Sequence, residues 1–199
     1  MIAHLFRPIV PFRLRSERGQ SIVEFAVTLP FIMLMTLGVV ETSQALMQQH
    51  VTTKMAREGS NMISRETRLT DAATVLRNMS SNPGGFSSST RVIFSVLMLS
   101  NTGTNNGQIV LYQRYETGDM SLPGSRLNGS GTFVAANDYA ANNPHNTPSL
   151  RVTNAPTNVV TVPGGLIYVT EVYTRYNLLT PVPNIGLPIP QQLYSVAYF

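Results

Sequence analysis

The hydrophobic pattern of the chain divides it into an apolar run near its start and a longer part of mixed character. From Ile22 to Val40, Glu24 is the only charged residue in a run of 19. A run of this length can cross a hydrocarbon core of about 30 Å as a helix. Pro30 lies inside the run, and membrane helices tolerate a proline because neighbouring groups satisfy the freed backbone carbonyl. The pattern predicts a transmembrane helix over residues 20–41.

Basic residues gather ahead of the apolar run. Residues 1–19 hold four arginines and one glutamate, a net charge of +3, and form a basic leader. Arginine-rich flanks stay on the cytoplasmic side, so we expect a cytoplasmic N-terminus and an outer domain beyond residue 41. The rest of the chain has a net charge of only +1. It therefore has no basic face for a nucleic acid, and we expect no nucleic-acid partner.

Three processing fates of the apolar helix are compatible with the sequence. It can remain as an uncleaved signal anchor. It can be a secretory signal peptide, because Ser43 and Ala45 are small residues at the spacing that cleavage after Ala45 prefers. It can also be cleaved at its cytoplasmic edge, between Gly19 and Gln20, which keeps the span in the mature protein.

Residues 42–80 continue the helical pattern beyond the membrane. Apolar or small residues recur at steps of three or four residues and predict the face that packs under a sheet: Met47, Val51, Met55, Gly59 and Met62. A second helix is expected from Asp71 to Met79, with Thr70 as its N-cap.

Residues 81–199 read as a β-rich extracytoplasmic domain. Four runs rich in Val, Ile, Tyr and Phe predict strands: Arg91 to Leu99, Gln108 to Glu116, Leu166 to Tyr176 and Leu193 to Phe199. The residues between the first two runs, 101–107, read as a hairpin loop. A Gly-, Pro- and Asn-rich connection, 117–163, is expected on the surface and is the part most suited to target contacts. The predicted fold class is α+β: a long N-terminal helix, its first half transmembrane, packed on a small antiparallel sheet.

The sequence offers no catalytic or metal-binding constellation. The chain has no cysteine, and its three histidines, His4, His50 and His145, are not at ligand spacing. Asp119 and Asp138 are isolated among glycines and asparagines, and no serine stands in a nucleophile elbow. We therefore expect a structural or interaction role, with no enzyme activity, no cofactor, no metal and no small-molecule substrate.

Three stretches resemble a known family. The segment RGQSIVEFAVTLP (Arg18 to Pro30) resembles the start of TadE-like minor pilins, or pseudopilins, of the Tad (Flp) pilus system. Gly19 is followed at the fifth and sixth positions by Glu24 and Phe25, and the apolar run closes in LGVVE. MAREGSNMISRE and, near the C-terminus, GGLIYVTEVYTRYNLLTP are similar to the helix after the span and to the terminal strand of that family. The resemblance covers residues 18–66 and 164–181.

The resemblance implies a pilin-like fold and a prepilin. A prepilin peptidase would remove the leader after Gly19, so the mature chain would start at Gln20 in the bacterial inner membrane. Its partners would be other pilins and the Tad assembly platform proteins. Its role would be that of a minor pilin contributing to pilus assembly, adhesion or secretion.

A physical account of Glu24 agrees with that implication. An ionised carboxylate inside a span costs roughly 2.5–3.5 kcal/mol, and such residues are usually paired. Cleavage after Gly19 creates an α-amine on Gln20, and Glu24 lies about 6 Å further along the helix. In a bundle of staggered spans, the amine of one chain and Glu24 of its neighbour would neutralise each other. The alternative is that Glu24 reaches the membrane interface or is protonated.

Two other classes of function fit the same sequence. One is a single-pass envelope protein whose outer domain binds a partner and whose span is only an anchor. The other is a secreted binding protein released after Ala45.

Overall fold

The structure, a computed structural model, describes residues 17–79, 89–156, 162–178 and 191–199. Most of the predicted leader, part of the long connection and the end of the C-terminal resemblance lie outside these residues. Two units make up the chain, Met1–Val40 and Glu41–Phe199. A long N-terminal helix followed by a six-stranded antiparallel sheet confirms the predicted α+β class.

The helix α1 runs from Glu17 to Ser64 and includes Pro30. Within the described residues, none of the most apolar 18-residue window of this helix is buried. Hydroxyl groups inside this part are satisfied within the helix, since Thr28 donates to the carbonyl of Glu24 and Thr36 to that of Ile32. By length and composition, α1 can cross a membrane once, as the sequence predicts.

In the second unit, α1 packs on the sheet through a face that only partly coincides with the predicted one. The buried positions are mostly small or polar: Thr52, Met55, Ala56, Gly59, Ser60 and Ile63. Met47 is 55% exposed, while Val51 and Met62 are only half-buried. The predicted face is therefore confirmed at Met55 and Gly59 and wrong at Met47, and the prediction missed the small and polar residues among the buried positions. Small side chains face the sheet because they let the helix backbone approach it closely.

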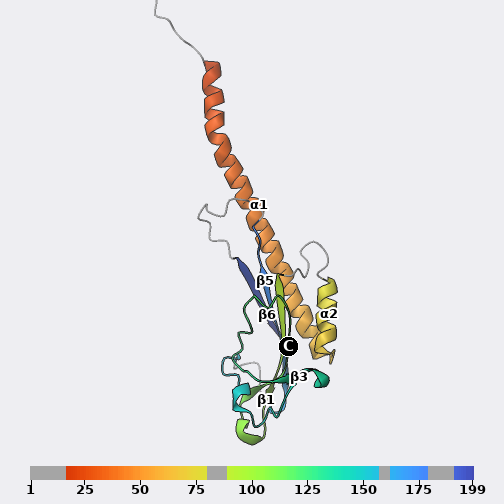
Figure 1. Cartoon of the computed structure of the whole chain (residues 1–199). Helices are drawn as coiled ribbons and strands as arrows, with labels where there is room; N and C mark the ends of the chain where they lie inside the picture. The colour runs from red at the N-terminus through yellow and green to blue at the C-terminus, as the bar shows by residue number, and fades with distance from the viewer. Residues whose placement is uncertain (1–16, 80–88, 157–161, 179–190) are drawn as a thin grey trace, which may run out of the picture. The chain divides into compact units, whose positions relative to one another are not determined.

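The helix α2, Leu69–Met79, begins two residues before the predicted start. The carboxylate of Asp138 accepts a hydrogen bond from the Leu69 backbone N–H at 3.2 Å, which satisfies a donor at the start of the helix. The cap therefore comes from Asp138, which is 69 residues further along the chain, and not from Thr70. The buried face of α2 joins α1 and the sheet in one core, and α2 lies beside the C-terminal part of α1 (Figure 1).

Six antiparallel strands form one sheet in the order β3-β4-β2-β1-β5-β6. The four predicted strands are confirmed within two residues at each end, and two short strands were not predicted. The loop between β1 and β2 is the predicted hairpin connection and contains one turn of 3-10 helix, Gly103–Asn105. The strands are β1 Thr90–Leu99, β2 Ile109–Gly118, β3 Phe133–Val134, β4 Ala140–Ala141, β5 Leu166–Arg175 and β6 Gln192–Tyr198.

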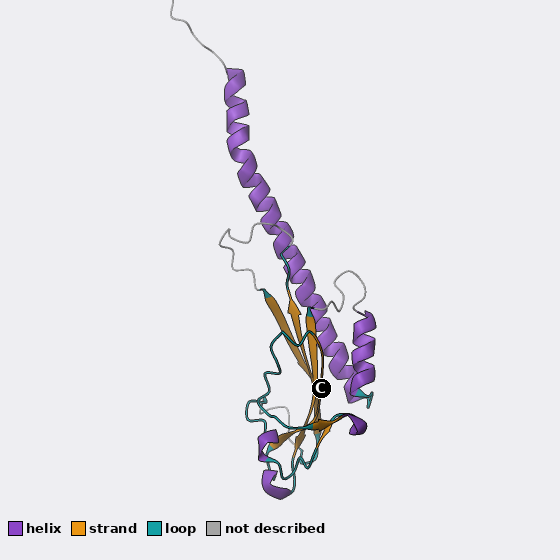
Figure 2. Ribbon diagram, in the orientation of Figure 1, coloured by secondary structure: helices purple, strands orange, loops and turns teal. Residues whose placement is uncertain are grey.

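The two faces of the sheet are covered differently. Alternate residues of β1, such as Phe94, pack against α1 and α2, while Leu97 packs against residues 119–156, here called the covering segment. Figure 2 shows the helices on one side of the sheet and this mostly irregular segment on the other. The segment was expected as a surface loop, but it also forms β3, β4 and two 3-10 turns. It supplies core residues: Leu122, Leu127, Leu150, Val152 and Ala155.

Candidate functional site: the N-terminal motif and the bonds of the outer unit

The four residues of the predicted processing and assembly motif lie in the first three turns of α1. Gly19 and Gln20 follow the start of the helix at Glu17, and Glu24 is one turn further along. The Gln20 side-chain amide donates a hydrogen bond to Glu24 Oε1 at 2.9 Å. Phe25 is 61% exposed. The motif is thus displayed on a helix surface that nothing in the described part of the chain covers.

The described residues supply no opposite charge to the carboxylate of Glu24. Its hydrogen-bond donor, the Gln20 amide, is neutral. Among the described residues, no basic side chain is ion-paired with Glu24. A carboxylate in a membrane span is costly unless it is paired, and no described side chain supplies the counter-charge of this one.

A second carboxylate, Glu41, is the first residue of the second unit, Glu41–Phe199, which is called the outer unit here because it lies outside the apolar part of α1. It is only 2% exposed. The Tyr176 hydroxyl donates to Glu41 Oε1 at 2.5 Å and is 3.1 Å from the Glu41 carbonyl oxygen. Burial, the hydrogen bond and the charge of Glu41 raise the pKa of Tyr176 to about 12. The hydrogen bond joins Glu41, which follows the apolar run, to Tyr176, the residue after β5. Both residues lie in stretches that carry the resemblance, but the sequence did not reveal the pair.

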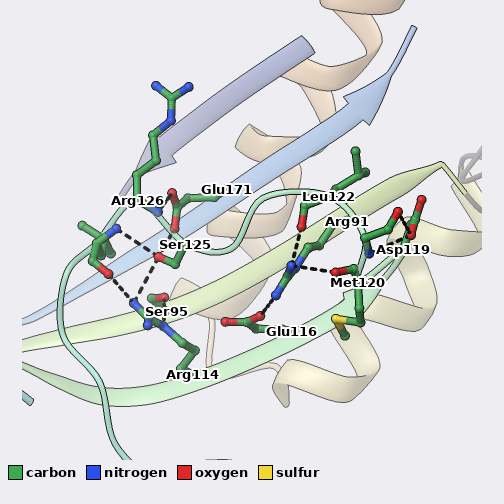
Figure 3. A network of polar contacts seen from close by, with 12 residues as sticks. Arg91, Ser95, Arg114, Glu116, Asp119, Met120, Leu122, Ser125, Arg126 and Glu171 are labelled. Carbon is green, nitrogen blue, oxygen red and sulfur yellow. Dashed lines mark hydrogen bonds and ion pairs between the residues drawn. The ribbon is translucent and has the colours of Figure 1, made fainter. Parts of the chain in front are cut away.

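Polar side chains on the outer face of the sheet hold the covering segment (Figure 3). Glu171 is 1% exposed and accepts hydrogen bonds from the Ser125 hydroxyl, the Arg126 backbone N–H at 2.9 Å and the Tyr194 hydroxyl at 3.0 Å. Burial and the charge of Glu171 raise the pKa of Tyr194, so its hydroxyl stays protonated and keeps donating. The Arg126 guanidinium lies 3.7 Å from the centre of the Tyr194 ring.

Two arginines from neighbouring strands complete this network. The Arg114 guanidinium donates to the Gly129 carbonyl at 2.9 Å and to the Ser125 hydroxyl at 3.1 Å. Arg91 forms an ion pair with Glu116 and donates to the Leu122 carbonyl at 2.5 Å. Burial lowers the pKa of Arg114, and the charges of Glu116 and Glu171 oppose that shift. These groups bind one another and the backbone of the covering segment, which makes the network a structural one.

Other polar residues that the sequence left open also have structural partners. The Ser100 hydroxyl is 2.8 Å from His145 Nδ1 and 3.0 Å from the Thr102 carbonyl, and Ser100 is buried. This pair joins the β1–β2 loop to the covering segment. Asp119 accepts hydrogen bonds from the backbone and the hydroxyl of Ser121. Within the described residues, no group of three or more His, Asp or Glu side chains is placed to hold a metal ion.

A single apolar helix ahead of an α+β outer unit fits the class of single-pass membrane proteins. Residues 19–61 match the model of the TadE-like protein family, which confirms the resemblance in this part of the chain. The matched residues include the whole N-terminal motif and most of α1. No curated protein and no solved structure matches the chain.

Proposed function

We propose that this chain is a minor pilin (pseudopilin) of a Tad pilus, inserted in the inner membrane with its N-terminus in the cytoplasm. A prepilin peptidase trims it after Gly19, and α1 then docks among the helices of other pilins on the assembly platform. The observation that carries the proposal is the bare apolar part of α1, with the uncompensated Glu24 held one turn from Gln20.

The docking step follows from the position of these two residues. Trimming leaves an α-amine on Gln20, a cation with a pKa of about 7.7–8.0. A neighbouring helix displaced by about 6 Å along its axis brings its own amine level with Glu24. In low dielectric, the pair is stabilised by its charges and avoids the cost of two isolated ions. The carboxylate therefore sets the axial stagger between neighbouring pilins.

The outer unit supports a structural role. Its buried Glu171 and its Arg114 guanidinium bind other side chains and the backbone of the same unit. We propose no catalytic activity and no small-molecule substrate for it. Its covering segment is held against the sheet, and it presents a fixed surface to whatever the pilus meets.

Substitution of Glu24 tests the proposal. Glu24→Leu removes a costly group from the span, so insertion and trimming after Gly19 continue, while pilus formation and co-purification with other pilins are lost. Glu24→Asp shortens the reach by one methylene and keeps part of the function. Thr36→Leu is the matched control, because it also replaces a polar residue of the span whose hydroxyl bonds only within its own helix.

Two measurements in the same cells give the result. Mass spectrometry of membrane protein reports trimming, and sheared pili together with co-purified pilins report assembly. If Glu24→Leu is trimmed and assembles like the wild type, the carboxylate has no docking role. If the wild type is neither trimmed nor associated with pilins, the chain is instead an envelope protein with a simple anchor.

A further inference from the structure

A polar hollow lies at the end of β5, close to the residue with which the chain leaves its apolar run. It has a volume of about 370 Å³ and is lined by Arg175, Tyr176, Asn177, Leu178, Gln191 and Gln192. We propose that this hollow binds the phosphate headgroup of a phospholipid in the membrane that holds the apolar run. The inference goes beyond the proposed function, because it requires only that the chain spans a membrane.

The hydrogen bond between Tyr176 and Glu41 places the hollow near the membrane surface. Glu41 directly follows Val40, the last residue of the apolar run. The run of 19 residues is about 28 Å long as a helix and matches a hydrocarbon core of about 30 Å. Glu41 therefore lies at the outer boundary of that core, and the Tyr176 hydroxyl is 2.5 Å from its Oε1. Both residues belong to the outer unit, so the hollow and the boundary residue are parts of one compact body.

The lining residues are within reach of the lipid headgroups. The headgroup layer on each side of the core is about 5–8 Å thick. Arg175 and Asn177 are the chain neighbours of Tyr176, and consecutive Cα atoms are about 3.8 Å apart. A tyrosine hydroxyl at the boundary of the core is typical of the aromatic belt of membrane proteins. An arginine beside it can extend its side chain to the interface.

The side chains of the hollow suit a phosphate group. Arg175 supplies a guanidinium, which binds phosphate oxygens through two parallel hydrogen bonds. Asn177, Gln191 and Gln192 are exposed, and each has a side-chain amide that can donate further hydrogen bonds. None of the six lining residues is acidic. The hollow thus offers one cation and several neutral donors to an anion.

The two carboxylates nearest to the hollow are bound inside the protein. Glu41 is only 2% exposed and accepts the Tyr176 hydroxyl, so its charge is withdrawn from the surface. Asp119 accepts two hydrogen bonds from Ser121 and lies 3.8 Å from the Arg175 guanidinium. The Arg175 side chain is 46% exposed, and among the described residues it donates only to the Ser121 hydroxyl, at 3.1 Å. Its other donors are therefore available to a phosphate.

The position of the hollow favours a lipid over an anion from solution. Because the span tethers the outer unit to the bilayer, headgroups are present at a high local concentration without a separate association step. A free phosphate ion lacks this advantage, and an exposed arginine alone holds an anion only weakly in water. The phosphate of a bilayer lipid is thus the occupant that both the chemistry and the position of the hollow fit.

Spin labels measure whether the hollow lies at the headgroups. The chain has no cysteine, so a single added cysteine carries the only label. The full chain is placed in nanodiscs that contain a nickel-chelating lipid, and headgroup-bound Ni²⁺ broadens the spectra of nearby labels. The label at Asn177→Cys is expected to be broadened. The label at Asn106→Cys, an exposed asparagine in the β1–β2 loop at the other end of the sheet, is not. Equal spectra at the two positions overturn the proposal.

Native mass spectrometry of the full chain in detergent measures binding itself. The probes are phosphatidylglycerol, phosphatidylcholine, diacylglycerol and inorganic phosphate. Arg175→Gln is expected to weaken the binding of phosphatidylglycerol about tenfold, equivalent to about 1.4 kcal/mol, because charge-assisted hydrogen bonds are lost. Arg68→Gln is the matched control, since it removes an exposed arginine from the turn between α1 and α2 and is expected to change nothing. Diacylglycerol, which lacks the phosphate, is expected to bind equally to Arg175→Gln and to the wild type.

The remaining outcomes separate the possible causes. Arg175→Lys keeps the charge without the planar fork and is expected to bind with intermediate affinity, and resistance to protease checks that each variant is folded. Unchanged binding of phosphatidylglycerol by Arg175→Gln overturns the proposal, because the lipid then binds elsewhere on the chain. Inorganic phosphate that binds as tightly as the phospholipids also overturns it. Neither measurement involves trimming after Gly19 or other pilins, so its failure is distinct from a failure of the proposed function.

Discussion

Gly59 of α1 lies close to Thr170 of the sheet, and a single methyl group there tests the packing. A Cβ atom on Gly59 would lie 2.7 Å from Thr170 Cγ2 and 3.0 Å from Thr170 Oγ1. The substitution Gly59→Ala gains about 1 kcal/mol from helix propensity. Overpacking of a tight contact costs roughly 1–3 kcal/mol. We expect the folded state to lose up to about 2 kcal/mol.

A double-mutant cycle with Thr170→Ser isolates the contact. Serine lacks the Cγ2 methyl, so the 2.7 Å approach disappears and the remaining hydroxyl can rotate away. In the Thr170→Ser background, Gly59→Ala should be neutral or stabilising, with a coupling energy of about 1–2 kcal/mol. The assay is urea unfolding of the full chain in detergent, followed by tyrosine fluorescence, because the chain has eight tyrosines and no tryptophan.

The result that refutes this reasoning is a Gly59→Ala variant that is about 1 kcal/mol more stable in both backgrounds. Helix propensity alone would then explain the gain in stability, and the added methyl group would make no steric clash with β5.

Three further substitutions probe the polar groups of the outer unit. Thr170→Val should raise the free energy of unfolding by about 1 kcal/mol and so raise the urea midpoint, because the buried Thr170 Oγ1 has no partner among the described residues. A lower midpoint would contradict this. Tyr176→Phe should cost about 1–3 kcal/mol at pH 7 by removing the donor to buried Glu41. Because folding raises the pKa of Tyr176 from 10.0 to about 12, the stabilisation of the fold by the Tyr176 hydroxyl is complete below pH 10 and is lost as the pH rises towards 12. Thermal melts of Tyr176→Phe should not show this loss. Glu171→Gln replaces an acceptor of three hydrogen bonds by an amide, so limited proteolysis should cut the covering segment sooner; an unchanged rate would contradict the role given to Glu171.

The sequence predicted the strands well because their pattern is local. Alternating β-branched and aromatic residues from Leu166 to Tyr176 mark a strand whatever it pairs with. The hairpin of β1 and β2 followed from two such runs separated by a short Gly- and Asn-rich loop. The transmembrane helix is equally local, because length and lack of charge decide it.

The buried face of α1 could not be read in the same way. The predicted stripe included Gly59, which does contact the sheet, but it also included the exposed Met47 and left out the buried Ala56 and Ser60. Helix periodicity identifies which residues share a face, and it does not say which face meets a partner when that partner requires close approach. The Ser60 hydroxyl, which donates to the Ala197 carbonyl at 2.9 Å, shows how a polar residue becomes a buried contact.

The polar network of the outer face had no signal in the sequence. Arg114, Ser125 and Glu171 come from parts of the chain that are far apart, and only the fold brings them together. The start of α2 could not be predicted for the same reason, because the carboxylate that caps it, Asp138, lies 69 residues from Leu69. The candidate assembly motif is the opposite case: Gly19, Gln20, Glu24 and Phe25 are close along the chain, so the resemblance to TadE-like pilins could identify them without knowledge of the fold.

The mature N-terminus of the chain is the most direct test of the central claim that it is a trimmed pilin. Protein is taken from native membranes, and its N-terminus is determined by sequencing or intact mass. The account predicts a chain that begins at Gln20, with the span retained. A chain that keeps residues ahead of Gly19 would indicate a simple anchor, and one that begins at Leu46 a secreted protein. Either of these results would contradict the account.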